Sequence, residues 1–265
     1  MIYIDNTSTD PAYNLALEEY LVVNDTRDVF MLWQNAPAVI VGRNQHTENQ
    51  VNREYAQKHG IAVVRRLSGG GAVYHDAGNL NFTIILRDAM RHRNDFTFFT
   101  NPILEVLQSY GVDARFSGRN DLTVEGKKFS GNAQYNYGST VLHHGTILWD
   151  SDLSVLAKVL KPKERVVARG VDSHESRVTN LVPYVPDHIT LDRFKEDLLE
   201  CMLSQKAFVQ GGELDGDSTL DFGKDSVIGD PIHPLREKYL SDTWNWGEGP
   251  AEDGEMPVIS FPASC

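Results

Sequence analysis

Cysteine is scarce in this sequence, and long apolar runs are missing from it. Only two of the 265 residues are cysteines, Cys201 and Cys265, and neither has a histidine or cysteine at metal-ligand spacing. We therefore expect neither a disulfide framework nor a structural zinc site. No apolar run approaches the roughly 18 residues of a membrane span, and Met1 leads straight into an apparent strand without a signal peptide. These absences predict a cytoplasmic protein that has no membrane partner.

Basic residues are also few. The chain has 25 lysines and arginines against 37 aspartates and glutamates, a formal net charge of −12. Non-specific nucleic-acid binding needs clustered basic residues, so we expect no nucleic-acid partner. Residues 211–265 hold twelve acidic and three basic residues, which leaves residues 1–210 compatible with a local site for an anionic ligand.

The two best-known phosphate-binding motifs are missing as well. A P-loop requires serine or threonine after Gly-Lys, but Gly126-Lys127 is followed by Lys128 and Gly223-Lys224 by Asp225. A dinucleotide-binding loop requires GxGxxG at the start of a helix, whereas Gly69-Gly70-Gly71 leads into a strand-like stretch. The sequence thus excludes both of these nucleotide-binding classes.

Helical and strand-like patterns are mixed along the chain, which predicts an α+β fold with a mixed β-sheet core and flanking helices. Asn35-Ala36-Pro37 separates two strands expected to be neighbours, and Glu125-Gly126 is a candidate hairpin turn. We expect one domain over residues 1–250 and a short tail over 251–265. Helices are predicted over 11–23, 51–60, 102–110, 190–206 and 233–240, and strands over 28–34, 38–43, 61–68, 120–135 and 139–149.

The stretch RRLSGGGAVYHDAGNLNFT, residues 65–83, places three glycines between an arginine pair and a histidine. Glycines allow a backbone to approach a ligand closely and to turn N–H groups toward an anion, and Arg65 or Arg66 could add a guanidinium. A glycine-rich hairpin with a solvated arginine pair is the alternative. The stretch alone does not decide between these interpretations.

A second group of motifs follows in GRNDLTVEGKKFSGNAQY, residues 118–135, and HHGTIL, residues 143–148. Together with the glycine-rich stretch, they resemble the lipoate-protein ligase A family, as do DPAYNLALEEY, WQNAPAVIVGRNQ, SRVTNL and YLSDTWNWGEGP. The resemblance implies the catalytic-domain fold of biotin and lipoate protein ligases. Two-domain members continue into a small C-terminal domain, which we expect this chain to lack.

The resemblance implies a two-step reaction that consumes ATP. Lipoate and Mg²⁺-bound ATP give lipoyl-adenylate and pyrophosphate, and a lysine ε-amine of an acceptor lipoyl domain then attacks the mixed anhydride. Activation is needed because a free carboxylate repels nucleophiles. The implied acceptors are E2 subunits of 2-oxoacid dehydrogenases and the glycine cleavage H protein, and an accessory subunit is implied as a partner in place of the missing domain.

By the same resemblance, Lys128 is the catalytic cation, placed between the lipoate carboxylate and the α-phosphate. Asn120 and Asp121 engage the nucleotide or its Mg²⁺, with an ordinary turn at a strand entry as the alternative. His75 and His144 line the pocket, and His143 is structural. The other residues expected to bind ATP or lipoyl-adenylate are Arg66, Ser68, Gly69, Gly70, Gly71, Ala72, Val73, Tyr74, Asn79, Ser130, Gly131, Gly145 and Thr146.

Three other functions stay open. An octanoyl- or lipoyl-transferase on this scaffold would carry the acyl group on a cysteine, but Cys201 is expected to be packed on a helix and Cys265 is the last residue. A non-catalytic lipoate- or adenylate-binding protein is disfavoured by the retained Lys128, and a biotin ligase ranks last. Because acceptor lipoyl domains are often acidic, we expect docking on residues 1–210.

Overall fold

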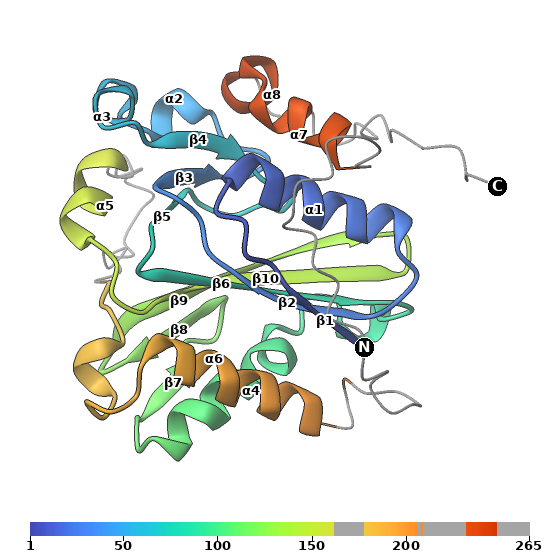
Figure 1. Cartoon of the computed structure of the whole chain (residues 1–265), viewed down its shortest axis with the longest axis vertical. Helices are drawn as coiled ribbons and strands as arrows, with labels where there is room; N and C mark the ends of the chain where they lie inside the picture. The colour runs from blue at the N-terminus through green and yellow to red at the C-terminus, as the bar shows by residue number, and fades with distance from the viewer. Residues whose placement is uncertain (162–177, 206–207, 209–231, 248–265) are drawn as a thin grey trace, which may run out of the picture.

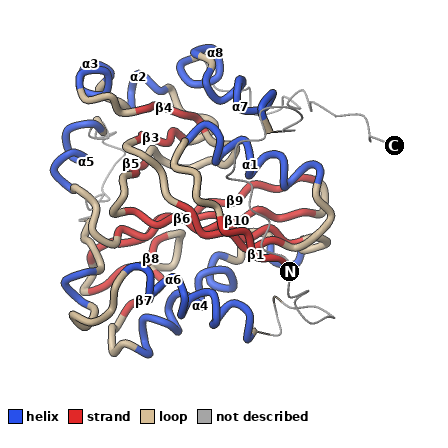
Figure 2. Tube along the Cα trace, viewed as in Figure 1, coloured by secondary structure: helices blue, strands red, loops and turns tan. Residues whose placement is uncertain are grey.

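The computed structural model describes residues 1–161, 178–205, 208 and 232–247, which form two β-sheets and the helices around them (Figures 1 and 2). The larger sheet has seven strands in the order β1-β2-β6-β10-β9-β8-β7. They are β1 (Ile2–Asp5), β2 (Val29–Trp33), β6 (Asn79–Leu86), β7 (Ala114–Phe116), β8 (Asp121–Val124), β9 (Lys127–Tyr137) and β10 (Thr140–Leu148). The smaller sheet has the order β4-β3-β5, with β3 (Ala38–Val41), β4 (Ala62–Arg65) and β5 (Val73–His75).

Helices cover both faces of the larger sheet (Figure 1). Helix α1 lies on the face toward the smaller sheet, which we call the α1 face, and α4 and α6 lie on the other, the α4 face. The α-helices are α1 (Pro11–Asn24), α2 (Thr47–Gln50), α3 (Arg53–Lys58), α4 (Phe96–Ser109), α5 (Leu153–Val159), α6 (Leu191–Ser204), α7 (His233–Leu240) and α8 (Asp242–Trp246), and short 3₁₀ helices are η1 (Met90–His92) and η2 (Val182–Tyr184).

Both sheets are mixed, as predicted. β1 runs parallel to β2 and β3 parallel to β4, whereas the other strand pairs are antiparallel. The expectation that β2 and β3 are neighbours is wrong, because they belong to different sheets. The polar segment between them redirects the chain: Asn35 is buried and bonded to Asn14 of α1, and the carbonyl of Pro37 accepts a hydrogen bond from the Ala62 N–H at 3.1 Å.

The helix predicted from residue 102 in fact begins at Phe96. Its N-cap is Asp95, whose carboxylate accepts from the Phe98 N–H at 3.1 Å, and Pro102 lies inside the helix. A side-chain cap followed by the buried Phe99 outweighed the helix-starting preference of proline. Two other predicted helix ends are confirmed: Asp10 caps the start of α1, and Gly60, with a φ of +63°, follows the end of α3.

Three apolar clusters hold these layers together. The largest packs the α4 face of the sheet, including Phe82 and Phe129, against α4 and α6. The second packs the α1 face against α1 and α7, and the third joins the smaller sheet to α3 and α5. Strand β2 is buried along its whole length because two clusters cover it.

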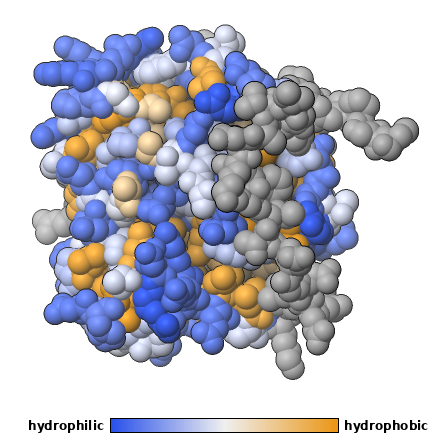
Figure 3. Space-filling model, viewed as in Figure 1, coloured by the Kyte–Doolittle hydropathy of each residue, from blue (hydrophilic) through white to orange (hydrophobic). Residues whose placement is uncertain are grey.

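One face of the molecule shows the polarity of its surface. Hydrophilic residues cover most of the face seen in Figure 3, with smaller hydrophobic patches between them. The large hydrophobic side chains exposed within the described ranges are Met90, Val182 and Leu240. None of the described helices is long and apolar enough to span a bilayer.

His143 is a structural residue of the α4 face. It is fully buried, its ring stacks on Phe99 with centroids 4.6 Å apart, and its ring nitrogens contact Gln134 and Asn132. Burial, with a smaller contribution from His144, lowers its pKa well below the usual value. The imidazole is therefore neutral in the folded protein.

Stability should fall in weak acid because of this histidine. Below its ordinary pKa of about 6.5, His143 takes up a proton in the unfolded chain but not in the folded one, which costs about 1.4 kcal/mol per pH unit. Urea unfolding of wild type and His143→Gln between about pH 7 and 5 measures the effect. We expect the free energy of unfolding of the variant to fall less steeply with decreasing pH, by about 1.4 kcal/mol per pH unit, which corresponds to one bound proton. Equal slopes would contradict a neutral, buried His143.

Candidate functional site

A row of residues crosses the α1 face from strand to strand. Trp33 of β2 pairs with Asn81 of β6, and Asn81 pairs with Thr146 of β10. The Gly131 N–H on β9 donates to the Thr146 hydroxyl at 3.3 Å, and Gly131 pairs with Asp121 of β8. Residues opposite one another in a sheet share a face, so the row places residues of five strands on one surface.

A bulge in β9 turns Lys128 onto this face. Thr123 pairs with Lys128 and Leu122 with Ser130, so Phe129 is the extra residue. Without it, Lys128 would share a face with Ser130, two positions along the strand. Instead Lys128 Nζ lies 2.7 Å from Asp121 Oδ1, and a Cβ added to Gly131 would lie 2.9 Å from the same nitrogen. Gly131 thus makes room for the Lys128 ammonium.

The glycine-rich loop between β4 and β5 lies over the same face. Arg66 is buried, and its guanidinium donates to the carbonyls of Ile40, Gly69 and Gly71 at 3.1, 2.6 and 2.8 Å. Desolvation lowers the pKa of Arg66 to about 10, so it stays protonated at neutral pH. The sequence predicted that Arg66 binds a nucleotide. In the structure its guanidinium binds backbone carbonyls of the loop itself.

Ser68 joins the loop to the sheet through a buried relay. Ser68 Oγ accepts from Arg66 Nε at 3.0 Å and lies 2.6 Å from His144 Nε2. His144 Nδ1 lies 3.0 Å from both carboxylate oxygens of Glu18 on α1. The Thr83 hydroxyl also donates to Glu18, at 2.5 Å. With a neutral imidazole protonated at Nδ1, each bond has one donor and one acceptor, and the relay links a buried cation to a buried anion.

His75 lies deeper, beside Trp33. Its Nδ1 accepts from Asn35 Nδ2 at 3.0 Å, and Asn35 is bonded in turn to Asn14 of α1. Burial, with smaller contributions from Arg66 and His144, lowers the pKa of His75 to about 3. Among the described residues, its buried Nε2 has no hydrogen-bond partner. A neutral imidazole with an unpartnered N–H is suited to a ligand acceptor.

Several predicted residues lie elsewhere. The Ser130 hydroxyl accepts from Asn132 Nδ2 at 3.2 Å, next to His143 on the α4 face. A Cβ on Gly145 would lie 2.3 Å from Asn132 Oδ1, so this glycine makes room within the α4-face packing. Asn120 Nδ2 donates to the Asn132 carbonyl at 2.9 Å. The structure places Ser130 and Gly145 on the opposite face from Lys128, and it uses the Asn120 amide to bind backbone.

The remaining predicted residues are close to the loop or the row. Gly69, Gly70, Gly71 and Ala72 lie between β4 and β5, Val73 and Tyr74 pair with Ile40 and Val39 of β3, and Asn79 bonds to Asn81 at 2.8 Å. Gly70 has a φ of +91°, which favours glycine. The described residues contain no group of three His, Cys, Asp or Glu side chains that could hold a metal by themselves.

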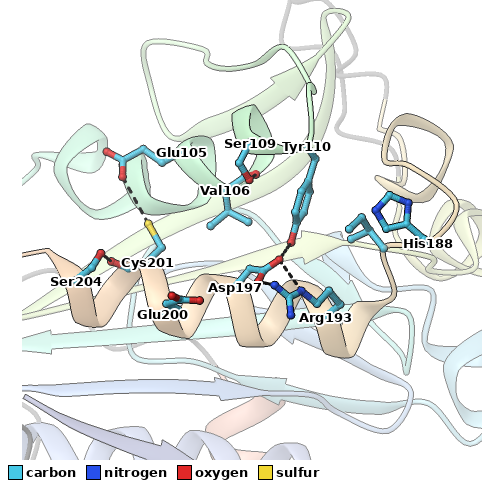
Figure 4. A pocket seen from close by; sticks show the side chains of 11 residues that line it. Glu105, Val106, Ser109, Tyr110, His188, Arg193, Asp197, Glu200, Cys201 and Ser204 are labelled. Atoms are coloured by element: carbon cyan, nitrogen blue, oxygen red, sulfur yellow. Dashed lines mark hydrogen bonds and ion pairs between the residues drawn. The ribbon is translucent and has the colours of Figure 1, made fainter.

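Cys201 lies far from this site, in a groove of about 850 Å³ between α4 and α6 (Figure 4). Its thiol points toward Glu105, with the sulfur 3.5 Å from the carboxylate. Burial and this carboxylate raise the pKa of Cys201 to about 11. A thiol that resists ionisation is a poor acyl carrier, which disfavours the transferase alternative. Cys265 lies outside the described residues.

Sequence reasoning missed Glu18, Thr83 and the role of Arg65. Glu18 and Glu19 were visible as two adjacent acids within the apolar run LALEEYL, and a helix buried on that side should not carry them without partners. Thr83 left no comparable signal, since threonine is ordinary in a strand. Arg65 was considered as an anion ligand, but the structure buries it completely.

Known proteins match both the sequence and the fold. The family model described as the lipoyl protein ligase A/B catalytic domain matches residues 10–203. Lipoate-protein ligase LplJ of Bacillus subtilis is 37% identical over 255 residues, covering 94% of this chain and 75% of the relative. Lipoate–protein ligase 1 of Staphylococcus aureus is 37% identical over 249 residues, covering 93% and 73%.

Two solved structures have the same fold. One belongs to an archaeal lipoylation system of Thermoplasma acidophilum, described as a bipartite lipoate protein ligase and its E2 lipoyl domain; its TM-score is 0.74 at 25% identity, covering 96% of this chain and 98% of that one. The other is a lipoate-protein ligase A bound with ATP, with a TM-score of 0.71 at 25% identity, covering 93% and 99%.

Two glycines of the motif should respond differently to alanine. A Cβ at Gly78 would lie 2.0 Å from the Asp150 carbonyl oxygen, whereas one at Gly71 meets nothing within 4 Å. Urea unfolding should show a loss of about 3 kcal/mol for Gly78→Ala and no measurable loss for Gly71→Ala. Equal losses in the two variants would contradict an open space above Gly71.

Proposed function

This chain belongs to the lipoyl protein ligase A/B catalytic-domain family, and from that premise we propose a role for each group of its site. The protein is an ATP-dependent lipoate-protein ligase that forms lipoyl-adenylate and then an amide on an acceptor protein. One observation carries the assignment of roles: the bulge puts the Lys128 ammonium on the face that the glycine loop covers.

Lys128 serves the activation step. A lipoate carboxylate oxygen attacks the α-phosphorus of ATP, a P–O bond forms, and pyrophosphate leaves with the electrons of the broken P–O bond. Both reacting groups are anionic, so a cation between them lowers their repulsion. Asp121 holds Lys128 in place before substrate arrives. The pair is partly exposed, at 26% and 22% of the two side chains, so substrate anions can compete with Asp121 for the ammonium.

The loop and the two pocket histidines hold the substrates. Gly69 and Gly71 have no heavy atom within 4 Å of an added Cβ, which leaves the space above them to a ligand. We assign the nucleotide phosphate to the loop amides there. His75, with its unpartnered buried Nε2, donates to the ligand, and the Glu18-bound His144 fixes the position of Ser68.

In the transfer step, the neutral amine of an acceptor lysine attacks the acyl carbon, the acyl–phosphate bond breaks, and AMP leaves. Lys128 stabilises the negative charge on the departing phosphate. The amine loses a proton as the amide forms. Lipoyl domains fit as acceptors, as in the Thermoplasma system, and we place their docking surface within residues 1–210.

Further parts of the function are proposals of the same kind. Mg²⁺ is bound through one or two carboxylates and the phosphates of its nucleotide in many enzymes, and Asp121 can supply one such carboxylate. A separate accessory subunit assists activation, and the reaction takes place in the cytoplasm.

The intact mass of an apo lipoyl domain after incubation with protein, lipoate and Mg-ATP tests this function. We expect a gain of one lipoyl group with wild type, a rate at least about 100-fold lower with Lys128→Ala, and near wild-type rates with Lys127→Ala. Lys127 is a matched control because it is adjacent but lies beside Glu125 and Tyr184.

Preformed lipoyl-adenylate separates the two steps. Transfer from the adenylate without transfer from ATP would show that activation needs the accessory subunit. Full activity of Lys128→Ala in both assays would overturn the role of Lys128. No transfer from either donor by wild type would contradict the ligase function itself.

A further inference from the structure

Arg65 joins three segments of the chain that are distant in sequence. Its side chain is completely buried. The guanidinium donates to the carbonyls of Gly42, Arg43 and Gln45 at 3.1, 2.9 and 2.7 Å. The guanidinium also donates to Thr47 Oγ1 of α2. In α8 and directly after it, the carbonyls of Trp244, Asn245 and Gly247 accept from the same guanidinium at 2.8, 3.4 and 3.1 Å.

The backbone of Arg65 is held by the same helix. Asn245 Oδ1 accepts from the Arg65 N–H at 2.9 Å, and Trp244 Nε1 donates to the Arg65 carbonyl at 2.8 Å. Helix α8 therefore binds this residue through its amide, its carbonyl and its guanidinium. Arg66, which holds the glycine loop, is the next residue along the chain.

A second route leads from Arg65 to the loop through residues 42–45. The Arg43 N–H donates to the Ser68 carbonyl at 2.9 Å, while the Arg43 carbonyl accepts from Arg65. A Cβ on Gly42 would lie 2.1 Å from the Gly70 carbonyl oxygen, so the tip of the glycine loop rests directly on this segment. Movement of Arg65 would therefore disturb both supports of the loop.

Helix α7 anchors α8 to the body of the protein. Lys238 Nζ lies 2.7 Å from a Glu19 oxygen of α1, and the Tyr239 hydroxyl donates to the same carboxylate at 2.7 Å. The Lys238 ammonium also lies 4.2 Å from the centre of the Trp244 ring. Arg236 pairs with Asp10 at the start of α1, at 2.6 Å.

We propose that residues 232–247 form a clasp that positions the glycine loop for ATP, with Trp244 and Asn245 acting through Arg65 as positioning residues. The inference rests on the proposed function, in which this loop binds the nucleotide phosphate. These residues lie outside the part of the chain that the catalytic-domain family model matches, residues 10–203.

Two tryptophans of α8 provide a matched test. Trp244→Phe removes the N–H that binds the Arg65 carbonyl and keeps an aromatic ring at Lys238. Trp246→Phe changes a ring that stacks under Arg53 of α3, at 4.3 Å. We expect Trp244→Phe to raise the KM for ATP about tenfold, the effect of one partly buried hydrogen bond, with kcat and the KM for lipoate changed less than about twofold.

Trp246→Phe should leave all three constants within about twofold of wild type. A merely structural role for Trp244 would lower the fraction of active protein, which reduces kcat and leaves KM unchanged. That pattern, or equal effects of the two substitutions, would overturn the clasp. If Trp244→Phe does not fold, Asn245→Ala replaces it in the test. This substitution removes the acceptor for the Arg65 N–H, and we expect the same rise in the KM for ATP.

Amide hydrogen exchange tests the clasp without any activity. In Trp244→Phe, peptides covering residues 66–72 should exchange faster, while those covering β9 and β10 stay as in wild type. Unchanged exchange of the loop would contradict the inference. If wild type transferred lipoate from neither donor but the loop still exchanged faster in Trp244→Phe, the ligase assignment would be wrong while the coupling between α8 and the loop would stand.

Discussion

The site depends on the burial of two successive guanidinium groups. Burying a charge is costly unless every donor finds a partner, and successive residues of a strand point in opposite directions. Arg65 therefore needs carbonyls on one side of β4, which come from residues 42–45 and from α8. Arg66 needs them on the other, and the glycine loop folds back to supply them. The shape of the loop follows from satisfying these two cations.

Alternation across the larger sheet separates chemistry from packing. In HHGT, His143 faces the aromatic core of the α4 face, whereas His144 faces the glycine loop. Gly145 and Ser130 belong with His143, and Thr146 and Gly131 with His144. Strict alternation would have sent Lys128 to the packing side. The bulge at Phe129 reverses it, so a core phenylalanine directly follows a lysine that lies on the opposite face beside Asp121.

Local signals in the sequence predicted most of the helices, because caps such as Asp10 act within one turn. The glycine-rich loop was also visible in the sequence, whereas the roles expected of Lys128 and the histidines came from the family resemblance. What could not be predicted depends on contacts over long separations. Glu18 meets His144 126 positions away, and Arg65 meets α8 about 180 positions away. The predicted start of α4 was wrong for a different reason, because an aspartate cap and a proline gave competing local signals.

The two pairs of opposite charge near the loop differ in how deeply they are buried. Glu18 and Arg66 are almost entirely buried and linked through Ser68 and His144, so separating them would leave unpaired charge in the interior. Lys128 and Asp121 are partly exposed, and exposed ion pairs contribute at most about 1 kcal/mol. A substrate can therefore displace Asp121 from Lys128 at small cost, while the support beneath the loop stays fixed. The mechanism that we propose requires this combination, because in it Lys128 exchanges partners during turnover while the loop keeps its position.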